Sequence, residues 1–194
     1  MQLDLQKVVT IDFETFFDSE YSLRKKELNT SGYIRDPRFL AHCASLKVGD
    51  NPTNIYWYDD IAPALKAIDW STHHLLAHNA AFDGLILAEH YGIIPPLYFD
   101  TVSMARALHG NSSRASLAAL CELYGMPGKN PNILLKMKGH RDIPPEIREE
   151  AAIYCIGDTD KCWEIFKQMI AVYPEREIEL IDWTIRQFCD PVLL

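Results

Sequence analysis

The sequence predicts an α/β fold in which a mixed sheet is flanked by helices, and it predicts a single domain over residues 1–190. The chain has 194 residues, which suits one domain that is large enough to bury a core. Three segments rich in β-branched and aromatic residues come first, and helices alternate with short strands after them. The remainder of the chain has mostly helical patterns, so the order is typical of a layered α/β sheet.

The spacing of apolar residues and the residues that favour turns predict the individual elements. Strands are expected at 8–16, 39–48, 54–58, 74–78 and 97–100, and helices at 61–68, 79–91, 101–108, 116–124, 145–172 and 175–188. Asn79 is expected to cap the helix that Gly92 closes. Residues 125–144 are rich in Gly, Pro and Asn, so we expect a loop or a mobile lid there.

Composition indicates an ordinary globular protein without a membrane partner. Hydrophobic residues make up 48% and charged residues 24% of the chain. No apolar run is long enough to span a membrane and the first residues do not resemble a signal peptide, so we expect a cytoplasmic location. The five cysteines lack zinc spacing and are expected to be buried. The net charge of −8 disfavours a nucleic-acid partner, although clustered carboxylates that hold cations can account for it.

The first predicted strand carries two acidic residues on one face. Period-two alternation places Asp12 and Glu14 on the same side, with Ile11 and Phe13 on the other. At about 4 Å and an effective dielectric constant near 20, two such carboxylates repel by about 4 kcal/mol. A divalent cation between them would turn this repulsion into binding. The pattern is equally compatible with a strand that has one solvated face.

Two later segments place further polar groups near helices. Asp83 falls in the first turns of the helix that follows Asn79, where the helix dipole also accommodates a purely structural carboxylate. Tyr154 and Asp158 are four residues apart in the long helix, so they share a face. Asp160 is about 200° around that helix from Asp158 and is expected to be solvated. Lys161 is expected to form a surface salt bridge or to reach a phosphate.

Together, the three segments resemble the three exonuclease motifs of the DEDD superfamily, whose members share a ribonuclease H-like fold. The matching residues are Asp12-x-Glu14, Asn79-x-x-Phe82-Asp83 and Tyr154-x-x-x-Asp158. Tyrosine in the third motif is typical of one subgroup of this superfamily. Other segments resemble the proofreading domains of family A DNA polymerases of the phage type, namely Asp100-Thr101 and Ser116-Leu117-x-x-Leu120 with Gly125 and Lys129. Each motif is weak alone, but their shared order makes the resemblance specific.

The resemblance implies a 3′–5′ exonuclease that hydrolyses DNA with two Mg²⁺ or Mn²⁺ ions. One ion would be held by Asp12, Glu14 and Asp158, and the second by Asp12 with Asp83, directly or through water. The Tyr154 hydroxyl would orient the attacking water. Ligands that are all oxygen atoms suit these cations better than zinc.

Residues that contact the substrate are less well defined by the sequence. Phe16 and Asn79 lie beside the first two motifs, and Phe16 either packs in the core or contacts a nucleotide. Lys136, Lys138 and Arg141 belong to a basic segment that begins at Lys129 and is expected to grip the strand or to be a simple connection. Aromatic and basic side chains in 24–26 and 33–38 are expected either to guide a single strand or to be solvated.

The expected partners are single-stranded DNA or a frayed 3′ end and a covalently linked polymerase domain, with this chain as a fragment of a longer protein. Proofreading during DNA replication is the implied role. A stand-alone exoribonuclease of the same superfamily is the first alternative. A scaffold that binds single strands without cleaving them is the second, although its four acidic residues would repel one another without benefit.

Overall fold

In the computed structural model, residues 3–23, 28–110, 114–128 and 132–189 are described, and they form a five-stranded sheet. The strand order is β3-β2-β1-β4-β5, in which β1 pairs antiparallel with β2 and parallel with β4. The strands are β1 (Val8–Thr15), β2 (Ala41–Val48), β3 (Asn54–Trp57), β4 (His74–Ala77) and β5 (Tyr98–Asp100). The predicted mixed sheet and each of the predicted strands are confirmed, with ends that differ by a residue or two.

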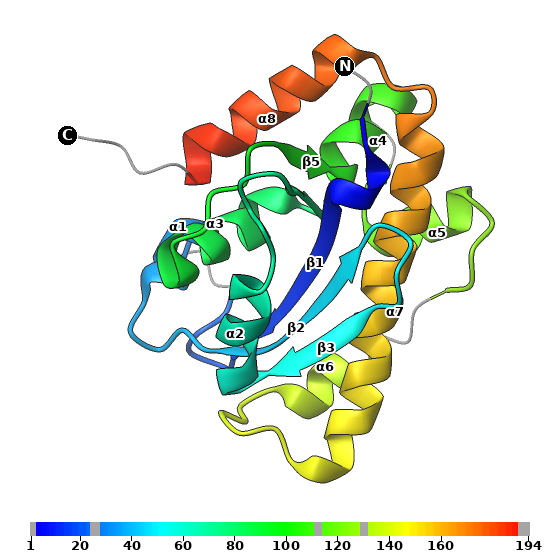
Figure 1. The fold of residues 1–194 in the computed structure, drawn as a ribbon. Helices are drawn as coiled ribbons and strands as arrows, with labels where there is room; N and C mark the ends of the chain where they lie inside the picture. The colour runs from blue at the N-terminus through cyan, green and yellow to red at the C-terminus, as the bar shows by residue number, and fades with distance from the viewer. Residues whose placement is uncertain (1–2, 24–27, 111–113, 129–131, 190–194) are drawn as a thin grey trace.

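The described helices cover both faces of this sheet (Figure 1). They are α1 (Thr30–Arg35), α2 (Ile61–Lys66), α3 (Ala80–Tyr91), α4 (Thr101–His109), α5 (Leu117–Leu123), α6 (Asn132–Met137), α7 (Pro145–Ile170) and α8 (Glu175–Cys189), with 3₁₀ turns at Leu5–Lys7 and Tyr58–Asp60. Helix α7 packs against β1 and β2, and α4, α5 and α6 flank it. On the other face α3 packs against β4, with α1 and α8 beside it. Among the described helices, none is long and apolar enough to cross a membrane.

Helix α6 corrects the prediction of a loop throughout 125–144. Ile133 and Met137, one helical turn apart, are buried together with Ile143 against Ala151 of α7. The Gly, Pro and Asn content of the segment therefore marks the ends of a short helix and not a continuous loop. Figure 1 shows α6 beside the N-terminal half of α7, at the end of the molecule opposite α8.

Helix α1 was not predicted either, because its sequence has little helical propensity. The side chain of Asn29 caps it by accepting a hydrogen bond from the Gly32 N–H. Tyr33 and Ile34 are buried in the core, so tertiary packing stabilises the helix. The five cysteines are all free and buried, as predicted.

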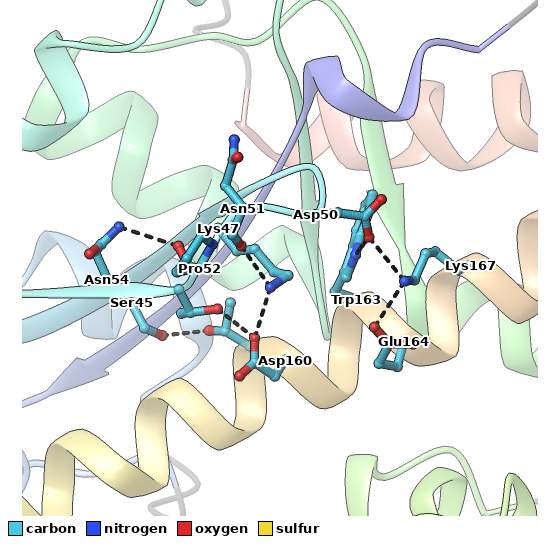
Figure 2. Close-up of polar contacts among 12 residues, drawn as sticks. Ser45, Lys47, Asp50, Asn51, Pro52, Asn54, Asp160, Trp163, Glu164 and Lys167 are labelled. Atoms are coloured by element: carbon cyan, nitrogen blue, oxygen red, sulfur yellow. Dashed lines mark hydrogen bonds and ion pairs between the residues drawn. The ribbon is translucent and has the colours of Figure 1, made fainter.

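The polar side of α7 is tied to the turn between β2 and β3 (Figure 2). Asp160 accepts hydrogen bonds from Lys47 (3.1 Å) and Thr53 (2.5 Å) while its side chain stays 46% exposed, so it is only partly solvated. Asp50 accepts from the indole N–H of Trp163 (2.9 Å) and from Lys167 (3.0 Å). These contacts hold α7 in one orientation across the sheet.

The buried face of α7 is wider than a single stripe. Cys162, Ile165 and Met169 lie in the core beside Trp163 and Phe166, whereas Ala152, Ile156 and Ile170 are only half-buried. The reason is that α7 meets the sheet along one side and α4 and α5 along another.

Candidate active site

The carboxylates of the first motif face α7. Asp12 and Glu14 pair with Ser45 and Cys43 of β2 across the sheet, and directly paired residues share a face. Ser45 donates a hydrogen bond to the carbonyl of Cys155 in α7 (3.1 Å). The sulfur atoms of Cys43 and Cys155 are 3.6 Å apart. The predicted alternation therefore directs both acidic side chains toward the helix that carries the third motif.

The opposite face of β1 belongs to the core. Ile11 and Phe13 are buried there, and the Phe13 ring stacks on Tyr91 of α3 with the ring centres 5.9 Å apart. This packing holds β1 rigidly against α3. The strand thus presents its carboxylates from a fixed backbone.

Asp83 reaches β1 from the first turn of α3. Its side chain is 3% exposed, and its Oδ1 accepts a hydrogen bond from the Phe13 N–H (3.1 Å). Strand β4 pairs with β1 only at residues 8–10, so the carboxylate of Asp83 satisfies a backbone group beyond the parallel pairing. Burial, and then the charge of Asp12, raise the pKa of Asp83 well above its usual value. These two carboxylates are therefore neighbours.

Tyr154 and Asp158 complete the cluster from α7. Asp158 is buried and Tyr154 is half-buried. Burial raises the pKa of the Tyr154 hydroxyl, and the charges of Asp158, Glu14 and Asp12 raise it further. The hydroxyl thus lies among three carboxylates and stays protonated.

The donor chemistry of this cluster fits a hard divalent cation. Within the described ranges, no group of three or more His, Cys, Asp or Glu side chains is already arranged to hold a metal ion. However, the residues that converge from β1, α3 and α7 offer only carboxylate oxygens, which suit Mg²⁺ or Mn²⁺. A cation would also offset the cost of burying Asp83 beside Asp12. Asp12, Glu14, Asp83 and Asp158 are the residues that would hold it.

Asn79 begins α3, but its side chain does not cap the helix as predicted. The residue has a left-handed backbone with φ = 74°, and it makes no side-chain capping hydrogen bond. The N–H groups of Asn79 and Ala80 instead donate to Oδ1 of Asp100 (2.8 and 3.2 Å). Because this turn carries α3, the position of Asp83 depends on Asp100.

Asp100 also caps α4, where it accepts from the N–H groups of Val102 and Ser103 and from the Ser103 hydroxyl. An aspartate directly before an apolar helix predicts such a cap. The link to α3, twenty residues earlier in the chain, has no local signal in the sequence. Nearby, the Nδ1 atom of His78 is 2.8 Å from the Thr101 hydroxyl, so His78 is held at the end of β4.

Of the two roles that the sequence allows for Phe16, the structure favours packing in the core. Its ring is only 5% exposed, stacks on Tyr21 and is covered by the guanidinium of Arg141 at 4.9 Å. Little of it is left for a nucleotide. Tyr33 is likewise buried, so it cannot stack on a strand. Residues 24–26 and Lys129 lie outside the described residues.

The remaining basic candidates are at the surface. Lys136 pairs with Glu150 of α7 (2.5 Å). Arg141 donates to the carbonyl of Arg38 (3.1 Å), and Lys138 is exposed between them in sequence. Arg38 itself pairs with Asp36, which offsets its charge.

Several solved structures have a fold similar to that of this chain. Brucella melitensis NrnC with bound Mg²⁺ is 15% identical with a TM-score of 0.62, over 95% of this chain and 84% of that chain. Escherichia coli RNase D, an exoribonuclease involved in structured RNA processing, is 12% identical with a TM-score of 0.66, over 97% of this chain and 47% of that one. Trypanosoma brucei RNase D in complex with RNA U12 is 13% identical with a TM-score of 0.66, over 98% and 67%. These similarities establish a ribonuclease H-like α/β fold.

The chain belongs to the 3′–5′ exonuclease family, which it matches over residues 2–172. It is of the DEDD type, so the resemblance seen in the sequence is confirmed. The matched range includes β1, α3 and α7, and therefore all five residues of the candidate site. No curated protein sequence matches the chain significantly.

Proposed function

We propose that this 3′–5′ exonuclease removes nucleotides from the 3′ end of DNA and proofreads during replication. In this proposal Asp12, Glu14, Asp83 and Asp158 hold two Mg²⁺ or Mn²⁺ ions. The observation that carries the proposal is the meeting of carboxylates from three separate elements, with Asp83 beside Asp12 and with Asp12, Glu14 and Asp158 near the protonated Tyr154 hydroxyl. A similar fold with bound Mg²⁺, that of NrnC, supports the choice of cation.

The ions, when bound, would activate a water molecule and stabilise the charge that develops on the attacking and leaving oxygens. The chain's own residues supply the geometry. The backbone N–H of Phe13 fixes Asp83 by donating to its carboxylate, and the pairing of β1 with β2 fixes Asp12 and Glu14. Tyr154 keeps its proton, so its hydroxyl acts by hydrogen bonding and orients the water; it does not act as a base.

Lys138 and Arg141 are proposed to contact the phosphates of the single strand, with Lys136 as a weaker contact because Glu150 offsets its charge. Such local cations explain how a chain of net charge −8 binds a polyanion. Asn79 is proposed to face the terminal nucleotide from the start of α3. The same proposal places this domain beside a polymerase domain of one polypeptide, in the cytoplasm.

A second candidate, exoribonuclease activity, is favoured by a different observation. Two of the structures with a similar fold are RNase D proteins, and one of them was solved in complex with RNA. The carboxylate cluster serves either substrate equally well, because it acts on the phosphodiester that DNA and RNA share. The segments that resemble proofreading domains are the reason to place DNA first.

The deciding experiment is digestion of 5′-labelled single strands of DNA and RNA, side by side, with Mg²⁺. We expect a ladder that shortens the DNA by one nucleotide at a time, and no products in excess EDTA. Faster shortening of RNA would favour the second candidate. Cleavage that persists undiminished in EDTA, or in Asp12→Ala, would exclude the metal-dependent site.

A further inference from the structure

The face of α7 that carries Tyr154 and Asp158 continues in both directions as one wall of a groove. On the opposite side lies Ile133 of α6, and the groove has a volume of about 190 Å³. Its lining residues on α7 are Glu150, Ile153, Tyr154, Gly157, Asp158 and Lys161. They recur at intervals of three and four residues, so they form a single stripe along the helix. The groove is therefore continuous with the candidate active site.

The groove combines an exposed apolar side chain with a cation. Ile153 is 67% exposed at the groove, although a large apolar side chain is normally buried, whereas Ile133 on the other side is itself buried. Lys161 lies one helical turn beyond Asp158, and among the described residues its ammonium group donates a long bond of 3.4 Å to the Gly128 carbonyl. Glu150, at the far end, is paired with Lys136. This arrangement suits a ligand with an apolar or aromatic part and a negative charge.

Gly157 lies in the floor of the groove, in the interior of a long helix. Glycine destabilises a helix interior relative to alanine, so a structural reason is expected for its presence. A methyl group added at this position would meet no atom within 4 Å. Packing therefore does not require glycine here. What its missing side chain provides is space in the groove directly beside Asp158.

We propose that this groove binds one nucleotide of the substrate strand next to the scissile phosphate. The base and sugar lie against Ile153 over Gly157, and Lys161 contacts a backbone phosphate. The inference rests on the proposed function and extends it to residues that none of the three motifs contains. At about 190 Å³ the groove is smaller than the roughly 300–1,000 Å³ of pockets for drug-sized ligands, so it has room for the base of one nucleotide and not for a larger ligand.

The charge contact is tested with Lys161→Gln and the matched control Lys167→Gln. Both remove one positive charge from α7, but Lys167 lies at the β2–β3 turn with Asp50 and Glu164, away from the groove (Figure 2). Binding of a labelled single-stranded DNA is measured by fluorescence anisotropy in EDTA, which prevents hydrolysis, over a range of salt concentrations. We expect Lys161→Gln to weaken binding up to about fivefold. Its salt slope should fall by about 0.7, with no change in the control.

The space that Gly157 leaves in the groove is tested with Gly157→Ala. The control is Gln168→Ala, an exposed position on another part of α7. Gly157→Ala should raise the melting temperature by about 1–4 °C because it favours the helix. It should nevertheless weaken DNA binding severalfold, whereas Gln168→Ala leaves binding unchanged. A more stable protein with wild-type affinity would overturn the role of Gly157.

Equal affinities and salt slopes for all of these proteins would overturn the groove as a binding site. The two proposals can fail separately. If the wild type shortens neither DNA nor RNA with Mg²⁺, the proposed function fails whatever the binding data show. If the wild type cleaves and the groove variants bind normally, only the groove inference fails.

Discussion

The Tyr154 hydroxyl is the one neutral hydrogen-bonding group that the third motif places among the carboxylates. Burial and the charges of Asp158, Glu14 and Asp12 all raise its pKa, so it remains protonated near neutral pH. A protonated phenol can orient a water molecule, but it cannot accept a proton from it. Its contribution is therefore expected in the rate of the chemical step and not in cation affinity.

Tyr154→Phe removes only this hydroxyl. We expect the single-turnover rate of 3′-end cleavage to fall by about 10-fold to 10³-fold, which is typical for the loss of one positioned hydrogen-bonding group. The affinity for Mg²⁺, measured by titration of the protein, should stay at the wild-type value. An unchanged single-turnover rate would mean that the hydroxyl has no part in the reaction.

The imidazole of His42 is a buried polar group outside the carboxylate cluster. It is 1% exposed, and neither of its ring nitrogens has a hydrogen-bond partner in the described part of the chain. Its ring meets the edges of Phe16 and Tyr58. Burial, and then the charge of Arg141, lower the pKa of His42 to about 4, with Asp142 acting weakly in the opposite direction. The imidazole is therefore neutral in the folded protein.

This lowered pKa makes stability depend on pH. The unfolded chain binds a proton at His42 below about pH 6.5, whereas the folded protein does so only near pH 4, so the stabilisation present above pH 6.5 is lost as pH falls between these values. The loss amounts to at most about 3 kcal/mol. Urea unfolding at several pH values should show a smaller loss on acidification for His42→Leu than for the wild type. Parallel pH profiles for the two proteins would contradict this account.

At the scale of elements, Asp100 joins two helices at the end of β5. One carboxylate accepts from the backbone at the start of α3 and also caps α4, and the side chain is 4% exposed. The two helices are consequently held in a fixed relation to the sheet. The contact between Asp100 and the start of α3 therefore also fixes the position of Asp83, which lies in the first turn of that helix.

Asp100→Ala should destabilise the protein by about 1–4 kcal/mol, because loss of each helix cap costs about 0.5–2 kcal/mol. Thermal unfolding measures the loss. Asp100→Asn is the matched control, since asparagine is an equally good cap and retains the oxygen that accepts from Asn79, Ala80 and Val102. We expect it to retain most of the stability. Equal destabilisation by both variants would show that the negative charge, and not the capping oxygen, is required.

In the whole molecule, four of the 27 acidic residues lie where their charge is most costly. Asp83 is buried beside Asp12, and Glu14 and Asp158 both lie near the Tyr154 hydroxyl. Without a cation these carboxylates repel one another. The folded protein should therefore be stabilised by any ion that binds the cluster in the folded state alone.

Addition of Mg²⁺ at about 100 times its Kd should stabilise the wild type by about 2.7 kcal/mol. The melting temperature should rise accordingly, by several degrees. Asp12→Ala should lose this rise, and its melting temperature without metal should equal or exceed that of the wild type because a repulsive charge is gone. A wild type that melts at the same temperature with and without Mg²⁺ would count against a metal site in the folded protein.

The amino-acid pattern alone predicts the features that depend on local geometry. Alternation in β1 put Asp12 and Glu14 on one face, and helical spacing put Tyr154 and Asp158 on another, since the direction of each side chain follows from the backbone of its own element. The order of these motifs in the sequence also indicates the exonuclease family without any knowledge of tertiary contacts. The strands lay within a residue or two of the predicted bounds, but the start of α3 is held by Asp100 and not by the predicted Asn79 cap.

Which of these groups meet depends on the packing of elements that are distant in the sequence. The contact between Asp83 and the Phe13 N–H joins residues 70 positions apart, and no local pattern records it. Phe16 is a core residue because Tyr21 and Arg141 cover its ring. Helix α6 is stabilised because Ile133 and Met137 pack against apolar side chains of α7. Burial and proximity depend on how elements distant in sequence pack together, whereas side-chain direction depends on the element alone.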